Sequence, residues 1–309
     1  MPGQRPGYGA ALATVAFIGL IGLLAQLSGV ALLLFPELGA LAHDVLQRPR
    51  GAWARHPLLL VLTPLLAAVA GILISSALPY GVPAILLDVL ISVLLIRVLR
   101  SPVAPAISAG LLPLVLGVQA PIYPPAISVG TLAIALIAAL RARRGRHAAD
   151  AAHAAALHAH TAPMPLRALG VYLPIIALLA TLAACSGLRF ILFPPLAVIG
   201  YELFAHPRHC PWALRGWRLP LACTLAAAAG VALVLLCGVG ALAAMAALAF
   251  GIGVLYVLDL HAPPVLAVGL LPLLIAQPGP GFVLAVALGS SLMMLAFVAW
   301  RRVLRHADG

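Results

Sequence analysis

The sequence predicts an all-α polytopic membrane protein, made of two homologous helical repeats with about eight long spans plus four short broken or re-entrant helices. The chain is 64% hydrophobic and only 8% charged, with a mean hydropathy of +1.16. No soluble domain can bury that apolar fraction, because its surface must be largely polar. Several apolar runs reach about 20 residues, enough for a helix to cross roughly 30 Å of hydrocarbon. Strand-like alternation is absent, which disfavours a transmembrane β-barrel.

Internal similarity divides the chain into two halves. Stretches of the first half recur in the same order at offsets of 158 and 159 residues, with matching proline, glycine and arginine. Four matches in one order indicate a duplication. They pair 27–50 with 185–208, 66–71 with 225–230, 101–116 with 260–275, and GLLPL at 110–114 with GLLPL at 269–273. The predicted units are a first membrane repeat at 1–146, an Ala/His-rich linker at 147–166 and a second membrane repeat at 167–309.

Four long spans are predicted in each half. They lie near 10–34, 58–78, 82–100 and 122–141 in the first, and near 168–192, 219–237, 239–258 and 281–303 in the second. The start of the chain has one basic residue before a long apolar run and no clear cleavage site. We therefore expect an uncleaved first span there, not a signal peptide.

Two shorter apolar segments remain in each half. At 12 to 16 residues they are too short to cross a bilayer comfortably, and each opens with or near proline. Irregular backbone at membrane depth is tolerated only where protein buries it or water reaches it. These segments are therefore predicted to be re-entrant half-helices that begin inside the protein. They are 36–47, 103–117, 194–205 and 261–276.

The formal charge is +11, and all eighteen basic residues are arginine. The arginines lie between the spans, so we expect them to set topology and to contact lipid phosphates, with no role for nucleic acid. Arginine occupies corresponding places in the two halves, as at Arg50 and Arg208. Inverted halves would need opposite charge biases, so this placement favours parallel halves. We expect a multi-pass protein of the plasma (inner) membrane with both termini cytoplasmic; a homo-oligomer is left open.

The linker carries His147, His153, His158 and His160, which are conceivable ligands for a soft metal. No cysteine or carboxylate cluster completes a metal shell there. A solvated, partly helical connector is the favoured interpretation, and no cofactor is predicted.

Five of the seven acidic residues lie in or beside membrane segments, at Glu37, Asp44, Asp88, Glu202 and Asp259. An ionisable side chain in the bilayer costs roughly 2.5–3.5 kcal/mol, so it usually has a partner or a function. Asp88 has no counterpart, because its corresponding position is Ala247. We expect it to pair with Arg97 or Arg100, or to lie in a water-filled region.

Asp44 and Glu202 occupy corresponding places, and each precedes an arginine by six residues, Arg50 and Arg208. One interpretation is a salt bridge that fixes the end of the half-helix to the following loop. The other is that the two arginines attract anions at the mouth of a path.

Asp259 stands two residues before His261, at the head of the last short segment. The pair is suited to moving protons or to fixing the imidazole tautomer. Asp259 is equally suited to capping a helix that starts just after it.

The sequence has no enzyme signature. It has no Walker loop, GxSxG or HExxH, and no intramembrane aspartate pair at protease-like spacing. Half-helix N-termini carry partial positive charge, which suits a small anion. We therefore predict a permease or channel for a small inorganic anion. Its predicted substrate-binding residues are Arg50, Arg208, His261, Asp259, Pro263, Pro264, Asp44 and Glu202. The alternative is a non-transporting membrane scaffold or assembly protein, and an intramembrane enzyme using His261 and Asp259 comes third.

Two motifs resemble those of the HPP family of integral membrane proteins. FPPLAVIGYELFAHPR at 193–208 is similar to that family's apolar segment ending in a Gln-Pro-Arg-like turn before its second span. HAPP at 261–264 resembles its His-Pro-Pro motif before the last span, although Ala262 interrupts the motif and the first half has no histidine there. The resemblance implies two tandem four-span units, with nitrite as the transported ion because a chloroplast member is linked to nitrite transport.

Overall fold

The computed structural model describes residues 7–144, 163–208, 210–213 and 216–307, and its regular elements in these ranges are helices. Six of them are long and apolar enough to cross a membrane, judged by length and composition. This is the architecture expected of a multi-pass helical membrane protein. The six are α1 (Tyr8–Ser28), α4 (Pro57–Ala77), α7 (Tyr123–Arg144), α9 (Leu166–Ser186), α11 (Arg218–Cys237) and α14 (Pro280–Ala307).

The other two predicted spans, at 82–100 and 239–258, form shorter helices than expected. Helix α5 (Val82–Val98) and helix α12 (Ala241–Val257) have 17 residues each. Neither is among the six helices long enough to cross a membrane, so the predicted set of eight long spans is not reached in the described residues.

The physical cause lies at the ends of α5 and α12. Two residues after each helix the backbone turns left-handed, with φ of 48° at Arg100 and 46° at Asp259. The next backbone N–H, from Ser101 or from Leu260, then donates to a carbonyl five residues back at 2.9 Å. This arrangement closes a helix C-terminus, and it forces the chain to leave the helical path.

Four short helices occupy the positions of the predicted half-helices. They are α2 (Glu37–Gln47), α6 (Ala106–Leu116), α10 (Pro194–Ala205) and α13 (Pro264–Leu270), which a 3-10 turn η3 (Leu271–Leu274) extends. Proline stands at the N-cap or first position of each, where a missing backbone N–H is least harmful. The prediction that 103–117 and 261–276 hold helices shorter than their neighbours, beginning inside the protein, is confirmed.

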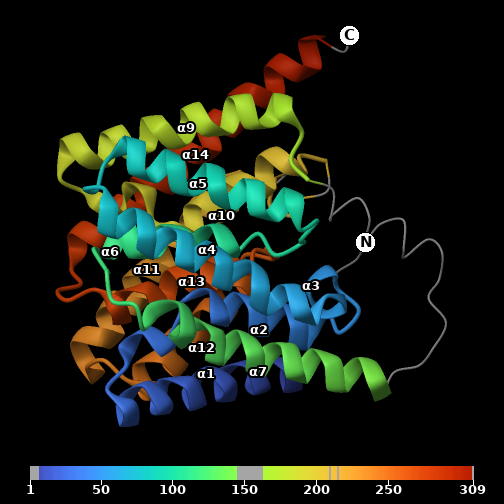
Figure 1. Ribbon diagram of the computed structural model, residues 1–309, viewed down its shortest axis with the longest axis vertical. Coiled ribbons are helices and arrows are strands. Elements are labelled where there is room, and N and C mark those ends of the chain that lie inside the picture. Colours follow the sequence, from blue (N-terminus) through green and yellow to red (C-terminus); the bar gives the residue numbers. More distant parts are fainter. Residues whose placement is uncertain (1–6, 145–162, 209, 214–215, 308–309) are drawn as a thin grey trace.

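The same order of elements occurs twice along the chain (Figure 1). The remaining elements are the 3-10 turns η1 (Ala31–Leu33) and η2 (Arg189–Leu192) and the short helix α3 (Ala52–Arg55). Elements α1, η1, α2, α4, α5, α6 and α7 are followed by α9, η2, α10, α11, α12, α13 with η3, and α14.

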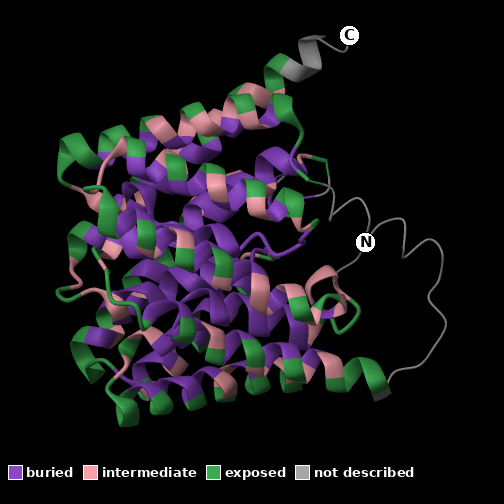
Figure 2. Cartoon of the chain, in the orientation of Figure 1, coloured by how far each residue is buried: buried purple, intermediate pink, exposed green. Residues whose placement is uncertain are grey.

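The two halves interlock. Helix α1 packs against α12 of the other half, and α9 packs against α5. The short helices meet in the interior, with α2 against α13, α13 against α10, and α10 against α6. Figure 2 shows this centre as the buried part of the molecule and the long helices at its rim as the exposed part.

Large apolar side chains cover the outer faces of the long helices. Leu20, Leu73, Leu132, Leu235 and Leu295 are all exposed, and they come from five different long helices. A water-soluble protein rarely leaves so continuous an apolar surface uncovered, whereas lipid solvates it well.

Two glycine contacts fix the short helices against the long ones. A Cβ atom added to Gly71 on α4 would lie 2.1 Å from the carbonyl oxygen of Gly110 on α6. A Cβ added to Gly230 on α11 would lie 2.2 Å from the carbonyl oxygen of Gly269 on α13. Only glycine permits so close an approach of two helix backbones.

Candidate functional site

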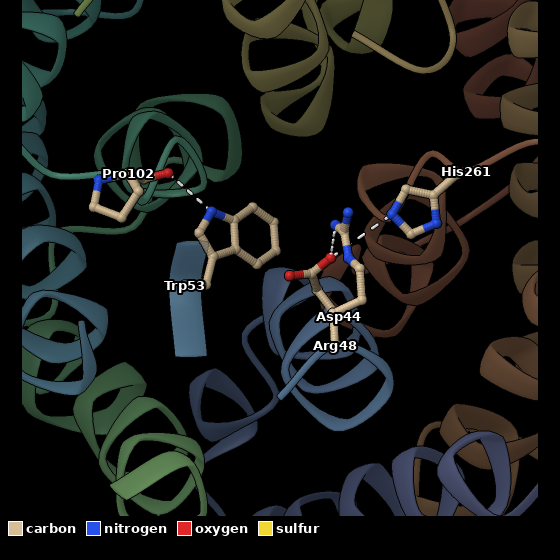
Figure 3. A network of polar contacts seen from close by, with 5 residues as sticks. All are labelled: Asp44, Arg48, Trp53, Pro102 and His261. Atoms are coloured by element: carbon tan, nitrogen blue, oxygen red, sulfur yellow. Dashed lines mark hydrogen bonds and ion pairs between the residues drawn. The ribbon is translucent and has the colours of Figure 1, made fainter. Parts of the chain in front are cut away.

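Asp44 is the centre of a polar network at one end of the bundle (Figure 3). Its carboxylate is buried in the last turn of α2, where Arg48 pairs with it from one turn further along. The Nε2 atom of His261, from the segment before α13, lies 3.7 Å from Oδ1 of Asp44. The structure therefore brings together two predicted site residues, Asp44 and His261, from different halves of the chain.

The bridge from Asp44 to Arg50, one of the two interpretations of their spacing, is wrong. Residues four apart on a helix share a face, so Arg48 reaches the carboxylate of Asp44. Arg50 lies beyond the end of α2 in an exposed turn, and it forms no ion pair with a described residue.

The corresponding bridge from Glu202 to Arg208 is also wrong, for the same reason. Nδ1 of His206, one turn after Glu202, lies 3.1 Å from the Glu202 carboxylate. Arg208 is exposed in the turn after α10, and within the described ranges no carboxylate pairs with it.

Asp259 is not a helix cap. It has a left-handed backbone, which aspartate tolerates better than most residues. Helix α13 begins at Pro264 with Pro263 at its N-cap, and both prolines are buried. The half-helix thus starts inside the protein, as predicted, but with proline in place of an acid at its start.

The opposite side of this network is chemically different. Trp53 of α3 donates from Nε1 to the carbonyl oxygen of Pro102 at 2.8 Å (Figure 3). Pro102 precedes α6 at the place that corresponds in sequence to His261 before α13. The second half therefore places the imidazole of His261 here, whereas the first half places the Pro102 carbonyl, which already accepts a hydrogen bond from Trp53.

A second polar group lies in the interior. Glu37, the first residue of α2, is 1% exposed, and its Oε1 accepts a hydrogen bond from the hydroxyl of Ser108 on α6. Its other oxygen, Oε2, is buried without a hydrogen-bond partner among the described residues. Acids of this kind are rarely buried without a functional reason.

Asp88 and Ser92 of α5 lie against α6, the helix that carries Ser108, and both are fully buried. A Cβ added to Gly110 of α6 would lie 2.7 Å from Oδ1 of Asp88 and 2.8 Å from Oγ of Ser92. Neither carboxylate oxygen of Asp88, nor the hydroxyl of Ser92, has a hydrogen-bond partner in the described parts of the chain.

The predicted pairing of Asp88 with Arg97 or Arg100 is wrong. Arg97 instead donates to the carbonyl oxygen of Met164 at 3.2 Å. Asp88 lies more than two turns before Arg97 on α5, too far along the helix for their side chains to meet.

This interior polar group belongs to the first half only. The sequence identified Glu37 and Asp88 as membrane acids, but it could not show that Ser108 and Ser92 accompany them. The corresponding positions of the second half are apolar, and they are Pro195, Ala247, Gly251 and Ala267. Polar residues at four positions of the first half, with apolar residues at the corresponding positions of the second, are the sequence signal that would have identified this polar group.

A pocket of about 200 Å³ lies at the far end of α4 from the Asp44 network. Arg189 of η2 lines it with Tyr80, Leu114 and Gln119. The Arg189 guanidinium lies 3.9 Å from the centre of the Tyr80 ring and donates from Nη2 to the Leu114 carbonyl oxygen at 2.9 Å. Its Nε–H is buried with no partner among the described residues. Sequence analysis did not single out Arg189.

A second pocket, of about 190 Å³, occupies the corresponding place of the other half. Ala31, Val239 and Leu273 line it, at the sequence positions that correspond to Arg189, Tyr80 and Leu114. The two pockets are therefore similar in size, but only the first is lined by an arginine and a tyrosine.

No group of three or more metal-ligating side chains occurs among the described residues. The linker histidines His147, His153, His158 and His160 lie outside the described residues. Comparison with protein-family models, with curated proteins and with solved structures gives no match for this chain.

Proposed function

We propose that this chain is a membrane permease for a small inorganic anion, built from two tandem HPP-like repeats. The main evidence that the solute is an anion is the pocket around Arg189. Its guanidinium is always charged, it forms no ion pair with a carboxylate of the described residues, and it keeps an unpartnered N–H.

The chemistry of this pocket suits an oxyanion. A guanidinium binds planar oxyanions through parallel hydrogen bonds, and such charge-assisted bonds are about twice as strong as neutral ones. The Tyr80 face and the Leu114 carbonyl already hold the guanidinium in place, so little side-chain entropy remains to be lost on binding. Nitrite is the proposed solute, as the HPP resemblance implies.

The interior supports transport over a purely structural role. Short helices that start at proline inside the bundle leave backbone groups free of regular helical bonding. Buried acids lie on the helices that lead from each site: Glu37 is two turns before Asp44 on α2, and Asp88 is on α5, which begins two residues after Tyr80 of the Arg189 pocket. A scaffold would have no use for buried acids that cost stability.

Two observations support the proposed duplication. The order of helices occurs twice, and several local features recur at the same sequence offset. The left-handed residues Arg100 and Asp259 correspond, and so do the glycine contacts Gly71–Gly110 and Gly230–Gly269.

Anion flux into liposomes containing the purified chain tests the proposal. The parent protein should take up nitrite faster than protein-free liposomes, and nitrate and chloride measured alongside define selectivity. Arg189→Gln should raise the nitrite concentration for half-maximal uptake by about ten- to a hundredfold, since a charge-assisted hydrogen bond contributes roughly 1.5–3 kcal/mol.

Arg218→Gln is the matched control. Arg218 also donates to a backbone carbonyl, that of Leu258, and also lies over an aromatic ring, that of Trp217. It lines neither of the two pockets. Equal effects of the two substitutions, or a parent protein that transports none of the three anions, would overturn the proposal and leave the scaffold.

A further inference from the structure

We propose that Glu37 and Asp88 form a proton-binding site that couples proton movement to the movement of the anion. This inference rests on the proposed permease function, because it names the ion that accompanies the solute. It uses residues of the interior that have no role in the Arg189 pocket.

The first argument is the absence of a counter-charge. Glu37 and Asp88 are essentially unexposed, and neither forms an ion pair with a cationic side chain of the described residues. An ionised carboxylate buried without a partner costs several kcal/mol, so burial favours the protonated form. A carboxyl that is neutral inside the protein and ionises when water reaches it is a proton carrier.

The second argument is independent of the acids. The Ser92 hydroxyl is fully buried and has no hydrogen-bond partner among the described residues. Like the carboxylate of Asp88, it lies beside the position that a Cβ of Gly110 would occupy. A natural core satisfies nearly all such groups. These three unsatisfied oxygens at one place are therefore available to bind a proton.

Within the described parts of the chain, the helices that pack against α2 and α5 carry no carboxylate and no histidine. Helices α4, α6 and α13, which pack against α5 or α2, have no titratable side chain. Helices α7 and α9 contribute the phenols Tyr123 and Tyr172, and each donates its hydroxyl proton to a backbone carbonyl, that of Ala109 and that of Ala197.

The remaining charged groups of these helices lie elsewhere. His43 and Asp44 are on α2 nearer the Asp44 network, Arg97 contacts Met164, and Arg141 donates to the carbonyl of Leu46. Arg55 of α3, Arg143 of α7, Arg167 of α9 and Tyr8 of α1 lie at helix ends. Glu37 and Asp88 are thus the carboxyl groups of this interior that have no counter-charge among the described residues.

The second half provides an internal comparison. Its corresponding positions cannot bind a proton, because Pro195 and Ala247 replace the two acids. One coupling site per chain is expected.

The test compares net uptake with exchange in liposomes containing the full chain. An inward proton gradient should accelerate net nitrite uptake by the parent, and a dye inside the vesicles should report proton entry with it. Asp88→Asn and Glu37→Gln imitate the protonated state. They should abolish the acceleration by a proton gradient, yet retain nitrite exchange across the membrane at equal pH.

Ser290→Ala is the matched control, because Ser290 is equally buried but bonds within its own helix to the carbonyl of Val286. It should keep both the acceleration and the exchange. Proton-driven uptake that survives in Asp88→Asn and Glu37→Gln would overturn the proposal, and so would parental uptake that follows a sodium gradient and ignores a proton gradient.

Infrared spectroscopy gives a readout that needs neither transport nor a folded variant. The parent protein at neutral pH should show the C=O stretch of buried protonated carboxyl groups, with a small shift in D2O. A parent protein that shows this band but transports no nitrite would refute the permease proposal and leave the proton site intact. Absence of the band from the parent would refute the proton site, whatever the flux.

Discussion

Gly71 and Gly110 touch through their backbones, where α4 crosses α6, and a Cβ on Gly71 would meet the Gly110 carbonyl oxygen at 2.1 Å. The obstacle is backbone, so it cannot rotate away as a side chain would. The helices must separate to admit even a methyl group, and the contacts around the crossing are lost together.

We therefore expect Gly71→Ala and Gly230→Ala each to destabilise the protein by about 1–3 kcal/mol through overpacking. Denaturant unfolding in detergent micelles measures the change. Gly170→Ala on α9 is the control, since nothing lies within 4 Å of its Cβ position. Equal stability of Gly71→Ala and Gly170→Ala would show that α4 and α6 do not approach so closely.

Asp44→Asn should destabilise the protein by about 1–3 kcal/mol, because it removes a buried charge that Arg48 and His261 both face. Arg48→Ala should cost less than about 1 kcal/mol, because the Arg48 side chain is 48% exposed and water replaces its partner. The same unfolding assay checks both. If Arg48→Ala lowered the free energy of unfolding more than Asp44→Asn does, the exposed arginine would contribute more to stability than expected.

Arg50→Ala and Arg208→Ala should leave the unfolding midpoint nearly unchanged, because both side chains are exposed and form no ion pair with a described residue. If they attract anions to the protein, each substitution should slow nitrite uptake at low salt. The difference from the parent should vanish near 1 M salt, where charges are screened beyond about 3 Å. A deficit that is independent of ionic strength would argue against attraction at a distance.

Parallel halves predict that Ser28 and Ser186, which end α1 and α9, face the same side of the membrane. Both are exposed, and each hydroxyl donates to the carbonyl four residues earlier. After the exposed Cys185 and Cys237 are changed to serine, Ser28→Cys and Ser186→Cys should react with a membrane-impermeant maleimide from the same side. Labelling from opposite sides would establish inverted halves.

Sequence reasoning predicted the short helices well because proline and length act locally. Residues 103–117 and 194–205 were identified by both signals, and the structure has helices there. It overestimated α5 and α12 because a left-handed residue such as Arg100 leaves little trace in hydropathy.

The candidate site was less predictable, because its contacts are tertiary or depend on where a helix ends. The repeat pattern made Arg50 one candidate partner of Asp44, whereas the helical period brings Arg48 to its carboxylate. Ser108 lies 71 residues from Glu37, and no local pattern joins them. Arg189 belongs to a pocket that the ends of other helices build around it.

The first helix of each half packs against the other half, and this arrangement determines how the chain can be divided. Because α1 covers α12 and α9 covers α5, each half leaves one wall of its own bundle to be supplied by the other. A chain cut in the linker would yield two fragments that are incomplete alone and complementary together. Produced separately, each would expose to lipid the small residues that belong inside, and the first fragment would also expose its buried acids. Co-expressed, they should assemble as an obligate heterodimer, so that two genes could replace this one without changing the bundle.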